Sequence, residues 1–357
     1  MRSEEEVVPT AENYDVVIIG GGPAGYAAAL YGASAGLDIA IVEKAKVGGT
    51  CLHVGCIPAK ELLETAAIRR AIAGSAQFGF IADEPLLDFS VTQQRKQQVV
   101  DQLFNGLSGL LKRRKVTVYD GTGSLHADHL VRVTGGASGD VEISGTHVLL
   151  ASGSVPRTIP GFEIDGFRVI TSDELLSLQK LPASAVVIGG GAIGCEFASM
   201  LSDLGTEVTI LEALPKILPG LDDDITRVVV KSFKDRGIQV RTGVSVNGHE
   251  PHDHDGGTRV LFGDGESIDV ETVVVSVGRR PLADDLGLDG TKVEVSDRGH
   301  VVVDDWCRTA ESGVSALGDL IATPALAPVG FAAGILVIQH ILGADPVPID
   351  YGKIPWC

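Results

Sequence analysis

The chain has 357 residues, a length that predicts two or three domains rather than one. It carries 29 Lys and Arg against 47 Asp and Glu, a formal charge of −18, so we expect neither nucleic acid nor an anionic membrane as a partner. The sequence contains no run of about 18 apolar residues, so it predicts no membrane-spanning helix. Five cysteines are too few for a secretory disulfide framework, which predicts a cytoplasmic protein whose disulfide, if it has one, is catalytic or sensing.

In chain order, residues 1–13 are acidic and polar and are expected to form a flexible tail. Residues 14–25 read YDVVIIGGGPAG and lead into an alanine-rich stretch, which predicts a strand, a glycine turn and a helix. That order opens a Rossmann unit, and it recurs at residues 185–204. Two copies imply two dinucleotide sites, and therefore two cofactors.

Between and after these units the sequence predicts mainly short strands. Residues 116–134 and 141–151 alternate apolar and polar side chains around glycines, as antiparallel strands do. Residues 270–277 and 300–303 predict further strands, and residues 325–342 predict an apolar helix. The fold class is therefore α/β, with two Rossmann-like, three-layer domains.

The first glycine turn has the spacing Gly20-x-Gly22-x-x-Gly25. The first glycine permits the tight turn, the second lets a pyrophosphate approach the backbone, and the third lets helix and strand pack closely. Glu43 follows eighteen residues after Gly25 at the end of the next predicted strand, where a carboxylate can accept both ribose hydroxyls.

The second turn repeats this arrangement with Gly189, Gly191 and Gly194, and Glu212 again stands eighteen residues after the last glycine. A carboxylate there would bond a free 2′-hydroxyl and repel a 2′-phosphate. The second site is therefore predicted to bind NAD rather than NADP.

The segment 48–60, GGTCLHVGCIPAK, contains two cysteines five residues apart, Cys51 and Cys56. In a regular helix they would be separated by a rise of about 7.5 Å and a rotation of about 140°. A disulfide needs Cα atoms about 4.4–6.8 Å apart. Either the pair is not bonded or the backbone is not a regular helix, and Gly55 supplies freedom to distort it. Pro58 is tolerated only near a helix start, and Lys60 would share a helical face with Cys56.

This segment resembles the redox-active segment of the class I pyridine nucleotide–disulfide oxidoreductases, and most closely that of the dihydrolipoamide dehydrogenases. Three further motifs support the resemblance, namely ASGS at 151–154, VGRRP at 277–281 and ALGD at 316–319. The likeness extends over residues 14–357.

The resemblance implies the domain order. Residues 14–154 would form the first part of an FAD-binding domain, 155–280 an inserted NAD-binding domain, and 281–345 the rest of the FAD-binding domain. Residues 346–357 would begin a dimerisation domain that is missing here. In the family that domain supplies a His–Glu acid/base pair, which no histidine of this chain matches, so we expect a fragment or a truncated gene with impaired activity.

The resemblance also implies residue roles. Cys51 would exchange with the substrate, Cys56 would be the thiolate that touches the flavin, and Lys60 would pair with Glu196 near flavin N5. Besides the glycines and Glu43, FAD contacts are implied for Gly49, Thr50, Lys60, Gly123, Ser152, Gly153, Ser154, Asp319, Leu326 and Ala327. NAD contacts are implied for Val246 and Gly278.

The implied reaction passes electrons between dihydrolipoamide, or another small dithiol or disulfide, and NAD through the Cys51/Cys56 disulfide and FAD. The implied assembly of the full-length protein is a homodimer, with a 2-oxoacid dehydrogenase complex as a possible partner. His249, His252 and His254 are expected to lie on a solvated hairpin and to bind no metal.

Two alternatives remain at this stage. His53, Ala59 and Pro328 depart from the pattern of the dihydrolipoamide dehydrogenases, and Pro328 followed by Ala333 resembles glutathione reductases. One alternative is therefore an NAD(P)H-dependent reductase of another disulfide or of mercuric ion. The other is a non-catalytic remnant that still binds FAD and NAD.

Overall fold

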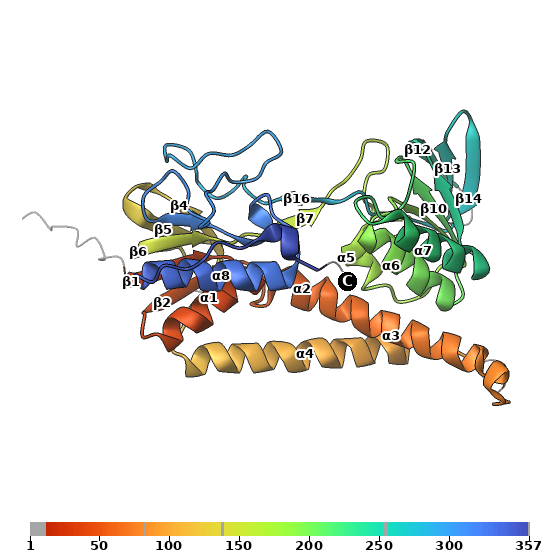
Figure 1. Cartoon of the computed structure of the whole chain (residues 1–357), viewed down its shortest axis with the longest axis horizontal. Coiled ribbons are helices and arrows are strands. Elements are labelled where there is room, and N and C mark those ends of the chain that lie inside the picture. The colour runs from red at the N-terminus through yellow and green to blue at the C-terminus, as the bar shows by residue number, and fades with distance from the viewer. Residues whose placement is uncertain (1–11, 82, 84, 137–138, 253–255, 356–357) are drawn as a thin grey trace, which may run out of the picture. The chain divides into compact units, whose positions relative to one another are not determined.

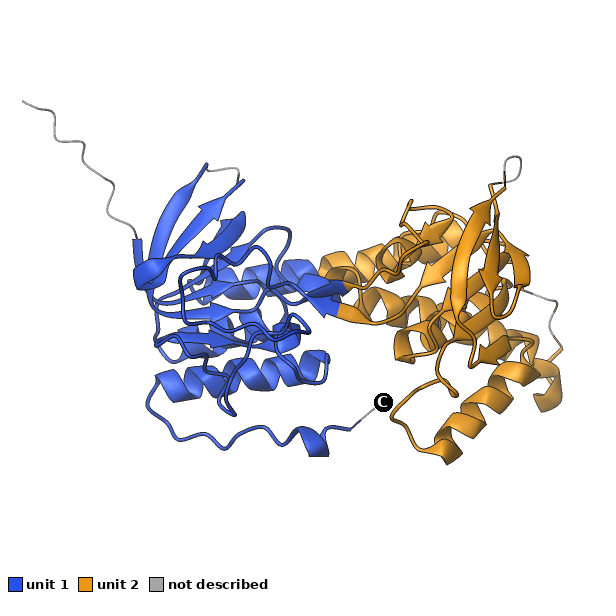
Figure 2. Ribbon diagram, turned by 90° about the horizontal axis from the view of Figure 1, so that it is seen from above, with its two compact units in different colours: residues 1–51, 103–155, 280–357 blue, residues 52–102, 156–279 orange. Residues whose placement is uncertain are grey.

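A computed structural model describes residues 12–81, 83, 85–136, 139–252 and 256–355. The chain divides into two compact units (Figure 2). Unit 1 comprises residues 1–51, 103–155 and 280–357, and unit 2 comprises residues 52–102 and 156–279. The changes near residues 155 and 280 lie within one residue of the expected domain limits. Most of the expected tail lies outside the described residues, and strand β1 already begins at Glu12.

Residues 52–102 group with unit 2, although the sequence placed them in the first domain. The cause is tertiary packing: helix α3 (Cys56–Ala73) lies against helix α6 (Ala192–Asp203) and shares a core with it. Helix α4 (Phe89–Arg113) then carries the chain back toward unit 1.

Unit 1 is built on a mixed sheet of seven strands in the order β3-β2-β1-β6-β5-β4, with β17 also paired to β6. Strands β3, β2, β1, β6 and β17 are parallel, and β6, β5 and β4 are antiparallel. The strands are β1 (Glu12–Ile19), β2 (Ile39–Glu43), β3 (Thr117–Asp120), β4 (Thr122–Leu125), β5 (Leu130–Thr134), β6 (Val141–Leu150) and β17 (Val314–Ala316).

Two strand predictions were wrong in part. Residues 116–134 do contain the antiparallel pair β4 and β5, but β3 is parallel to β2, because α4 precedes it as a crossover helix. Residues 300–303 form isolated bridges at Val301 and no regular strand. There the backbone turns tightly, with Ser296 and His300 hydrogen-bonded across the turn.

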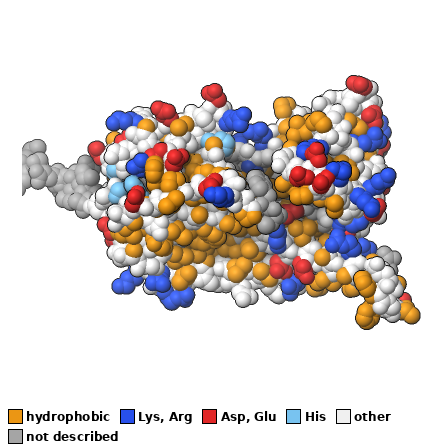
Figure 3. Space-filling model, viewed as in Figure 1, with side chains coloured by type: hydrophobic (Ala, Val, Ile, Leu, Met, Phe, Trp, Pro, Cys, Tyr) orange, Lys and Arg blue, Asp and Glu red, His pale blue; other side chains and the backbone are white. Residues whose placement is uncertain are grey.

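The helices of unit 1 pack closely. The predicted apolar helix is present as α8 (Ala327–Ile341), beside α1 (Pro23–Ser34) (Figure 1). A Cβ at Gly334 would lie 2.5 Å from the Ala24 carbonyl oxygen, so this glycine lets the two helices touch. Figure 3 shows apolar side chains gathered over this pair. The short helices are α2 (Gly49–His53), η2 (Ala127–His129), η3 (Gly318–Leu320) and η4 (Tyr351–Lys353).

Unit 2 contains a parallel sheet of five strands in the order β11-β10-β9-β15-β8 and an antiparallel sheet in the order β12-β13-β14. A two-stranded sheet pairs β7 (Ser154–Pro156) with β16 (Arg279–Pro281). The other strands are β8 (Val169–Ile170), β9 (Ser184–Ile188), β10 (Glu207–Glu212), β11 (Gln239–Thr242), β12 (Val246–Pro251), β13 (Thr258–Phe262), β14 (Glu266–Val270) and β15 (Thr272–Val275). The remaining helices are η1 (Ser75–Phe78), α5 (Ser172–Leu175) and α7 (Asp223–Asp235).

The parallel sheet of unit 2 separates two cores, as the alternation along β9 shows. Ala185 and Val187 face a core shared with α3 and α6, whereas Val186 and Ile188 face one shared with β13. This arrangement is the three-layer order that the sequence predicted. Among the described residues, none of the helices is long and apolar enough to cross a membrane.

Candidate active site and cofactor sites

The first glycine turn joins β1 to α1 at the carboxyl end of the unit 1 sheet. Gly20 has φ +111°, and a Cβ there would lie 2.2 Å from the Ala151 carbonyl oxygen. A Cβ at Gly25 would lie 1.9 Å from the Gly20 carbonyl oxygen, so any side chain would push α1 away from the strand. At Gly22 the nearest atom would be 3.9 Å away. The backbone is therefore open only at the position that faces a pyrophosphate in such turns.

The second turn, in unit 2, has the same construction. A Cβ at Gly189 would lie 2.3 Å from the Ser276 carbonyl oxygen, and one at Gly194 would lie 2.0 Å from the Gly189 carbonyl oxygen. Nothing lies within 4 Å at Gly191. Helices α1 and α6 each follow a glycine N-cap, which has no side chain to bond the first amide groups. Such amide groups suit a phosphate.

Each turn is tied to the carboxylate predicted for it. Glu43 Oε2 accepts from Gly21 N at 2.7 Å, and Oε1 accepts from Ala45 N at 2.9 Å. Glu212 repeats the pattern in unit 2, where Oε2 accepts from Gly190 N at 2.6 Å and Oε1 from Leu214 N at 2.7 Å. Each oxygen keeps a second lone pair, so both carboxylates are held at the strand end and can still accept ribose hydroxyls.

Residues predicted from distant parts of the sequence meet in unit 1. A pocket is lined by Gly20, Glu43, Gly123 and Ser152, which were all predicted. The pocket wall also contains Leu282, Asp284 and Asp285, which were not predicted. The sequence did offer a signal for them, because these residues directly follow the VGRRP motif. Ser152 Oγ donates to the Leu282 carbonyl at 2.6 Å.

Among the remaining predicted residues of unit 1, Gly49 lies against the first turn, and Asp319 is next to a glycine that approaches α1. Ser154 Oγ donates to Asp319 Oδ2 at 2.7 Å. Gly318, next to Asp319, would bring a Cβ to 3.1 Å from Ala24 on α1. A Cβ at Gly49 would lie 2.6 Å from Gly22 Cα, so α2, which also contains Thr50, begins against the turn. Leu326 is the N-cap of α8, and Ala327 is the first residue of that helix. Gly153 has a positive φ of +75°.

The predicted redox segment is not one regular helix. Helix α2 ends at His53 and α3 begins at Cys56, with Gly55 between them at φ −150° and ψ −118°. Of the two alternatives that the cysteine spacing left open, the structure therefore has the irregular backbone. Pro58 lies in the first turn of α3, where its missing N–H costs no hydrogen bond. Cys51 is half-buried in α2 and Cys56 is exposed at the start of α3.

Lys60 lies one helical turn after Cys56 on α3, and its Nζ donates to Glu196 Oε1 on α6 at 2.6 Å. The pair that the resemblance implied is therefore present. Its side chains are 61% and 37% exposed. An ion pair this exposed contributes only about 0–1 kcal/mol to stability, so it does not hold the two helices together by itself.

Comparison with known proteins agrees with this geometry. Residues 14–334 match the pyridine nucleotide-disulphide oxidoreductase family. The chain belongs to that family. It is 40% identical to the dihydrolipoyl dehydrogenase of Bacillus subtilis, over 97% of this chain and 75% of that protein. The dihydrolipoyl dehydrogenase of Geobacillus stearothermophilus is 36% identical over 96% of this chain and 72% of its own length.

Two solved structures have the same fold. LpdA from Mycobacterium tuberculosis superimposes with a TM-score of 0.88 at 27% identity, over 95% of this chain and 74% of that one. The flavoprotein disulfide reductase RclA from Escherichia coli, solved as a Cu(II) complex, has a TM-score of 0.83 at 30% identity, over 93% of this chain and 71% of that one.

As a family member, the chain is a flavin-dependent, NAD-linked disulfide oxidoreductase with FAD and NAD as its cofactors. Two dinucleotides fit the described residues. Each of the two glycine turns is open at its middle glycine and is tied to a strand-end carboxylate. The fit therefore rests on backbone shape and on the donor groups present.

The predicted NAD contacts Val246 and Gly278 both lie in unit 2. Val246 begins β12 and is partly buried against the core that includes Phe262. Gly278 has φ +106°, and its carbonyl accepts from Arg157 N at 2.9 Å.

The predicted histidine hairpin is described only in part. His249 Nδ1 lies 2.8 Å from Thr258 Oγ1, and His252 Nε2 lies 3.1 Å from Asp269 Oδ1, whereas His254 lies outside the described residues. Within the described ranges no group of three or more His, Cys, Asp or Glu residues is arranged to hold a metal ion.

Two further cysteines of this chain, Cys195 and Cys307, are buried and have raised pKa values. Burial, with Glu212 and Glu196 nearby, raises the pKa of Cys195 to about 12, and burial raises the pKa of Cys307 to about 11. A thiol with a raised pKa stays protonated below that value, and the thiolate is the reactive form.

We therefore expect selective alkylation of the reduced protein. At pH 8 only about one Cys195 in ten thousand is a thiolate, so iodoacetamide will label Cys195 and Cys307 at least about 100-fold more slowly than Cys56. Peptide mapping by mass spectrometry after timed labelling measures the rates, and denatured protein, in which all sites react, is the control. Equal rates for Cys56 and Cys195 in the folded protein would contradict this expectation.

Proposed function

We propose that this protein passes electrons between dihydrolipoamide, or a closely related small dithiol, and NAD through a Cys51/Cys56 disulfide and FAD. The relatives named dihydrolipoyl dehydrogenase support the substrate class, because they are up to 40% identical over nearly the whole chain. The observation that carries the proposal for this chain is the Lys60–Glu196 pair, which places an ammonium group one turn from Cys56.

We assign FAD to unit 1 and NAD to unit 2. Unit 1 holds the turn at Gly20, Gly22 and Gly25 together with Glu43, and the Ser154–Asp319 hydrogen bond lies in the same unit. The other residues of unit 1 that we assign to FAD are Gly49, Thr50, Gly123, Ser152, Gly153, Leu326 and Ala327, and Lys60, which belongs to unit 2, is assigned to FAD from the family resemblance alone. Unit 2 holds the second turn and Glu212, and Val246 and Gly278 are assigned to NAD with them.

When bound, FAD supplies two-electron chemistry between a nicotinamide and a thiol pair. The chain's own contribution is thiol exchange. One substrate thiolate attacks the sulfur of Cys51, the bond to Cys56 breaks, and Cys56 leaves as a thiolate. The second substrate thiolate then closes the substrate disulfide and releases Cys51, so that the substrate loses two electrons and the cysteine pair gains them.

The position of Cys56 favours its release as a thiolate. It is the first residue of α3, where the amide groups and the helix dipole stabilise negative charge. Lys60 adds a cation on the same helical face. Cys56 would therefore be the sulfur against the flavin, and Cys51 the sulfur that meets the substrate.

We further propose a cytoplasmic protein that serves a 2-oxoacid dehydrogenase complex and that forms a homodimer when it is full-length. The named activity of the relatives supports this setting, since a dihydrolipoyl group must be brought to the enzyme.

Substrate choice is tested by steady-state rates with lipoamide, glutathione disulfide and Hg²⁺ under one set of conditions. We expect lipoamide to have the largest kcat/KM by at least about 100-fold, because a matched site separates substrates by several kcal/mol. A larger value for glutathione disulfide or Hg²⁺ would contradict the substrate proposed here. The choice of NAD by Glu212 supports lipoamide over those acceptors.

Glu212→Ala is expected to raise the KM for NADH about 10- to 100-fold with little change in kcat. The change removes a hydrogen bond between the carboxylate and a ribose hydroxyl, worth about 1.5–3 kcal/mol, and that bond stabilises bound NADH before and during reaction alike. The preference for NADH over NADPH will shrink. Initial rates measure both, and Glu43→Ala is the matched control, because it should lower FAD content and leave the KM for NADH unchanged. An unchanged KM in Glu212→Ala would contradict the assignment.

A further inference from the structure

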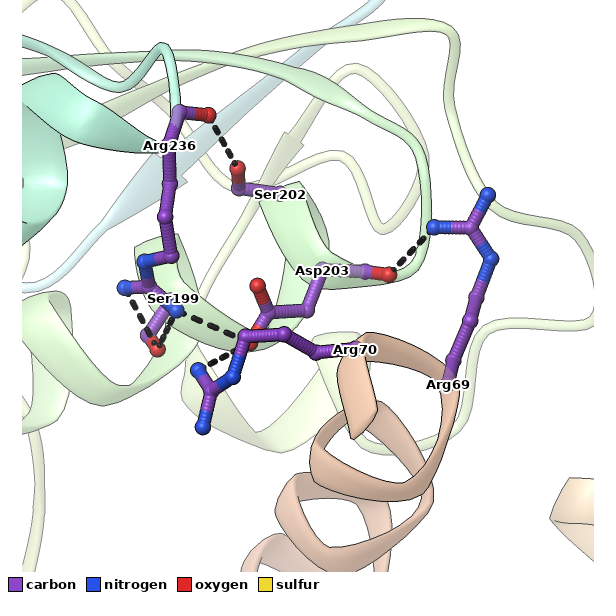
Figure 4. Close-up of polar contacts among 6 residues, drawn as sticks. All are labelled: Arg69, Arg70, Ser199, Ser202, Asp203 and Arg236. Atoms are coloured by element: carbon purple, nitrogen blue, oxygen red, sulfur yellow. Dashed lines mark hydrogen bonds and ion pairs between the residues drawn. The ribbon is translucent and has the colours of Figure 1, made fainter. Parts of the chain in front are cut away.

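A buried carboxylate, that of Asp203, lies at the carboxyl end of α6 in unit 2. The side chain of Asp203 is only 7% exposed, and its Oδ2 accepts from Arg70 Nη1 at 2.7 Å and from Arg236 Nη1 at 2.8 Å. Arg69 Nη1 donates to the backbone carbonyl of Asp203 at 2.7 Å. Figure 4 shows the three guanidinium groups around this residue. We call Asp203, Arg69, Arg70 and Arg236 the Asp203 cluster.

The cluster joins three helices. Asp203 is the last residue of α6, Arg69 and Arg70 lie near the end of α3, and Arg236 is the C-cap of α7. Arg236 also bonds Ser199 on α6 at 2.9 Å. The end of a helix leaves carbonyl groups unpaired and carries partial negative charge, so cations are favoured there. Arg69 and Arg70 connect this end of α6 to α3.

The same two helices are joined at their other ends by Lys60 and Glu196. Both contacts advance along α3 and α6 together, from Lys60 to Arg70 and from Glu196 to Asp203, so the helices run in the same direction. Between the contacts the interface is apolar and includes the small side chains Ala59, Ala66 and Ala198, as well as Leu62. Apolar contact is non-directional and does not fix how far one helix slides along another. Ion pairs can fix that register.

Burial decides which contact sets the register. The Lys60 and Glu196 side chains are 61% and 37% exposed, so water can replace either partner. The Asp203 carboxylate has little access to water, and its charge must be paired within the protein. The contact at Asp203 therefore constrains the two helices more than the exposed pair does, because its carboxylate is buried even though the Arg70 side chain is 52% exposed.

We propose that the Asp203 cluster is a positioning device for the redox segment: it fixes α3 against α6 and thereby sets the places of Lys60 and Cys56. The inference rests on the proposed function, in which Cys56 is the thiolate against the flavin. In this proposal the residues of the Asp203 cluster touch neither substrate nor cofactor, and they act through α3.

Two variants of the full chain separate positioning from stability. Arg69→Ala/Arg70→Ala removes both contacts to α3 and leaves Asp203 paired with Arg236, whereas Arg236→Ala removes the more buried cation and leaves α3 attached. Three quantities are measured: Tm, the rate of Cys56 alkylation at pH 7 after reduction with dithiothreitol, and the long-wavelength absorption that appears with NADH.

The double variant is expected to alkylate Cys56 about 3-fold or more slowly and to lose most of the long-wavelength absorption, because Lys60 is displaced. Arg236→Ala should lower Tm at least as much and keep the alkylation rate within about 2-fold of the parent. Arg69→Lys/Arg70→Lys should recover at least half of the lost rate. If Arg236→Ala does not fold, Arg236→Lys takes its place with the same expectation.

The inference is overturned if the double variant matches the parent in both readouts, or if Arg236→Ala slows alkylation as much as the double variant does. The proposed function fails separately, if the parent protein itself gives no long-wavelength absorption with NADH. Alkylation after dithiothreitol does not depend on the flavin, so it tests the cluster in either case.

Discussion

Cys56→Ser will lower lipoamide-linked turnover by more than about 10³-fold while both cofactors still bind. Serine cannot form the disulfide or leave as a thiolate, so the exchange has no electron acceptor. Neither glycine turn is touched by the change, because Cys56 lies at the start of α3. Steady-state lipoamide rates, FAD content and reduction of the bound flavin by NADH are measured on the same preparation.

Cys51→Ser is the matched control, because it removes the partner sulfur and leaves Cys56 in place. It should also lose lipoamide turnover, but it should show long-wavelength absorption before any NADH is added, since Cys56 is then a permanent thiolate. Lipoamide turnover in Cys56→Ser within about 10-fold of the parent would show that the reaction does not use this pair.

Gly25→Val and Gly194→Val should have opposite effects on the two cofactors. At Gly25 a Cβ would lie 1.9 Å from the Gly20 carbonyl, so valine displaces the first turn, and we expect FAD content below about a tenth of the parent. At Gly194 the corresponding distance is 2.0 Å from the Gly189 carbonyl. That variant should retain FAD and show a KM for NADH raised more than about 100-fold.

Flavin absorbance after gel filtration and NADH titration of the bound flavin measure these effects. Each variant is the control for the other, because the steric conflict is nearly equal and only the turn differs. Retention of FAD by Gly25→Val together with its loss from Gly194→Val would reverse our assignment of cofactors to the units.

The cofactor turns could be predicted because their requirements are local. Three glycines at fixed spacing and a carboxylate eighteen residues later describe a strand, a turn, a helix and the next strand end. The structure adds the reason for each glycine, as the 1.9 Å approach at Gly25 illustrates. The hydrogen bonds that Glu43 and Glu212 accept from the backbone amides of their own turns were not foreseen, although they explain why each carboxylate stays in place.

For the redox segment, the sequence predicted two alternatives and did not decide between them. Helical geometry showed that Cys51 and Cys56 could not be bridged across a regular helix, but it left open whether they are bonded at all. The structure breaks the helix at Gly55. In the sequence, Gly55 indicated only that the helix could be interrupted there. The pattern of apolar and polar side chains did not indicate whether it is.

Long-range packing accounts for what the sequence analysis missed. Lys60 and Glu196 lie 136 positions apart and were paired only through resemblance to the family. Residues 52–102 were predicted within the FAD-binding domain but group with unit 2, and nothing in their own periodicity indicates that α3 packs on α6. Asp203 and Arg70 were not singled out from the sequence, and the 7% exposure of the Asp203 side chain is seen only in the structure.

Anaerobic titration with NADH tests the central claim most directly. The cysteine pair and FAD together accept four electrons, so the protein should take up about two equivalents of NADH per FAD, with long-wavelength absorption rising over the first equivalent. Uptake of a single equivalent, with loss of the flavin absorbance and no long-wavelength absorption, would mean that Cys51 and Cys56 do not exchange electrons with the flavin.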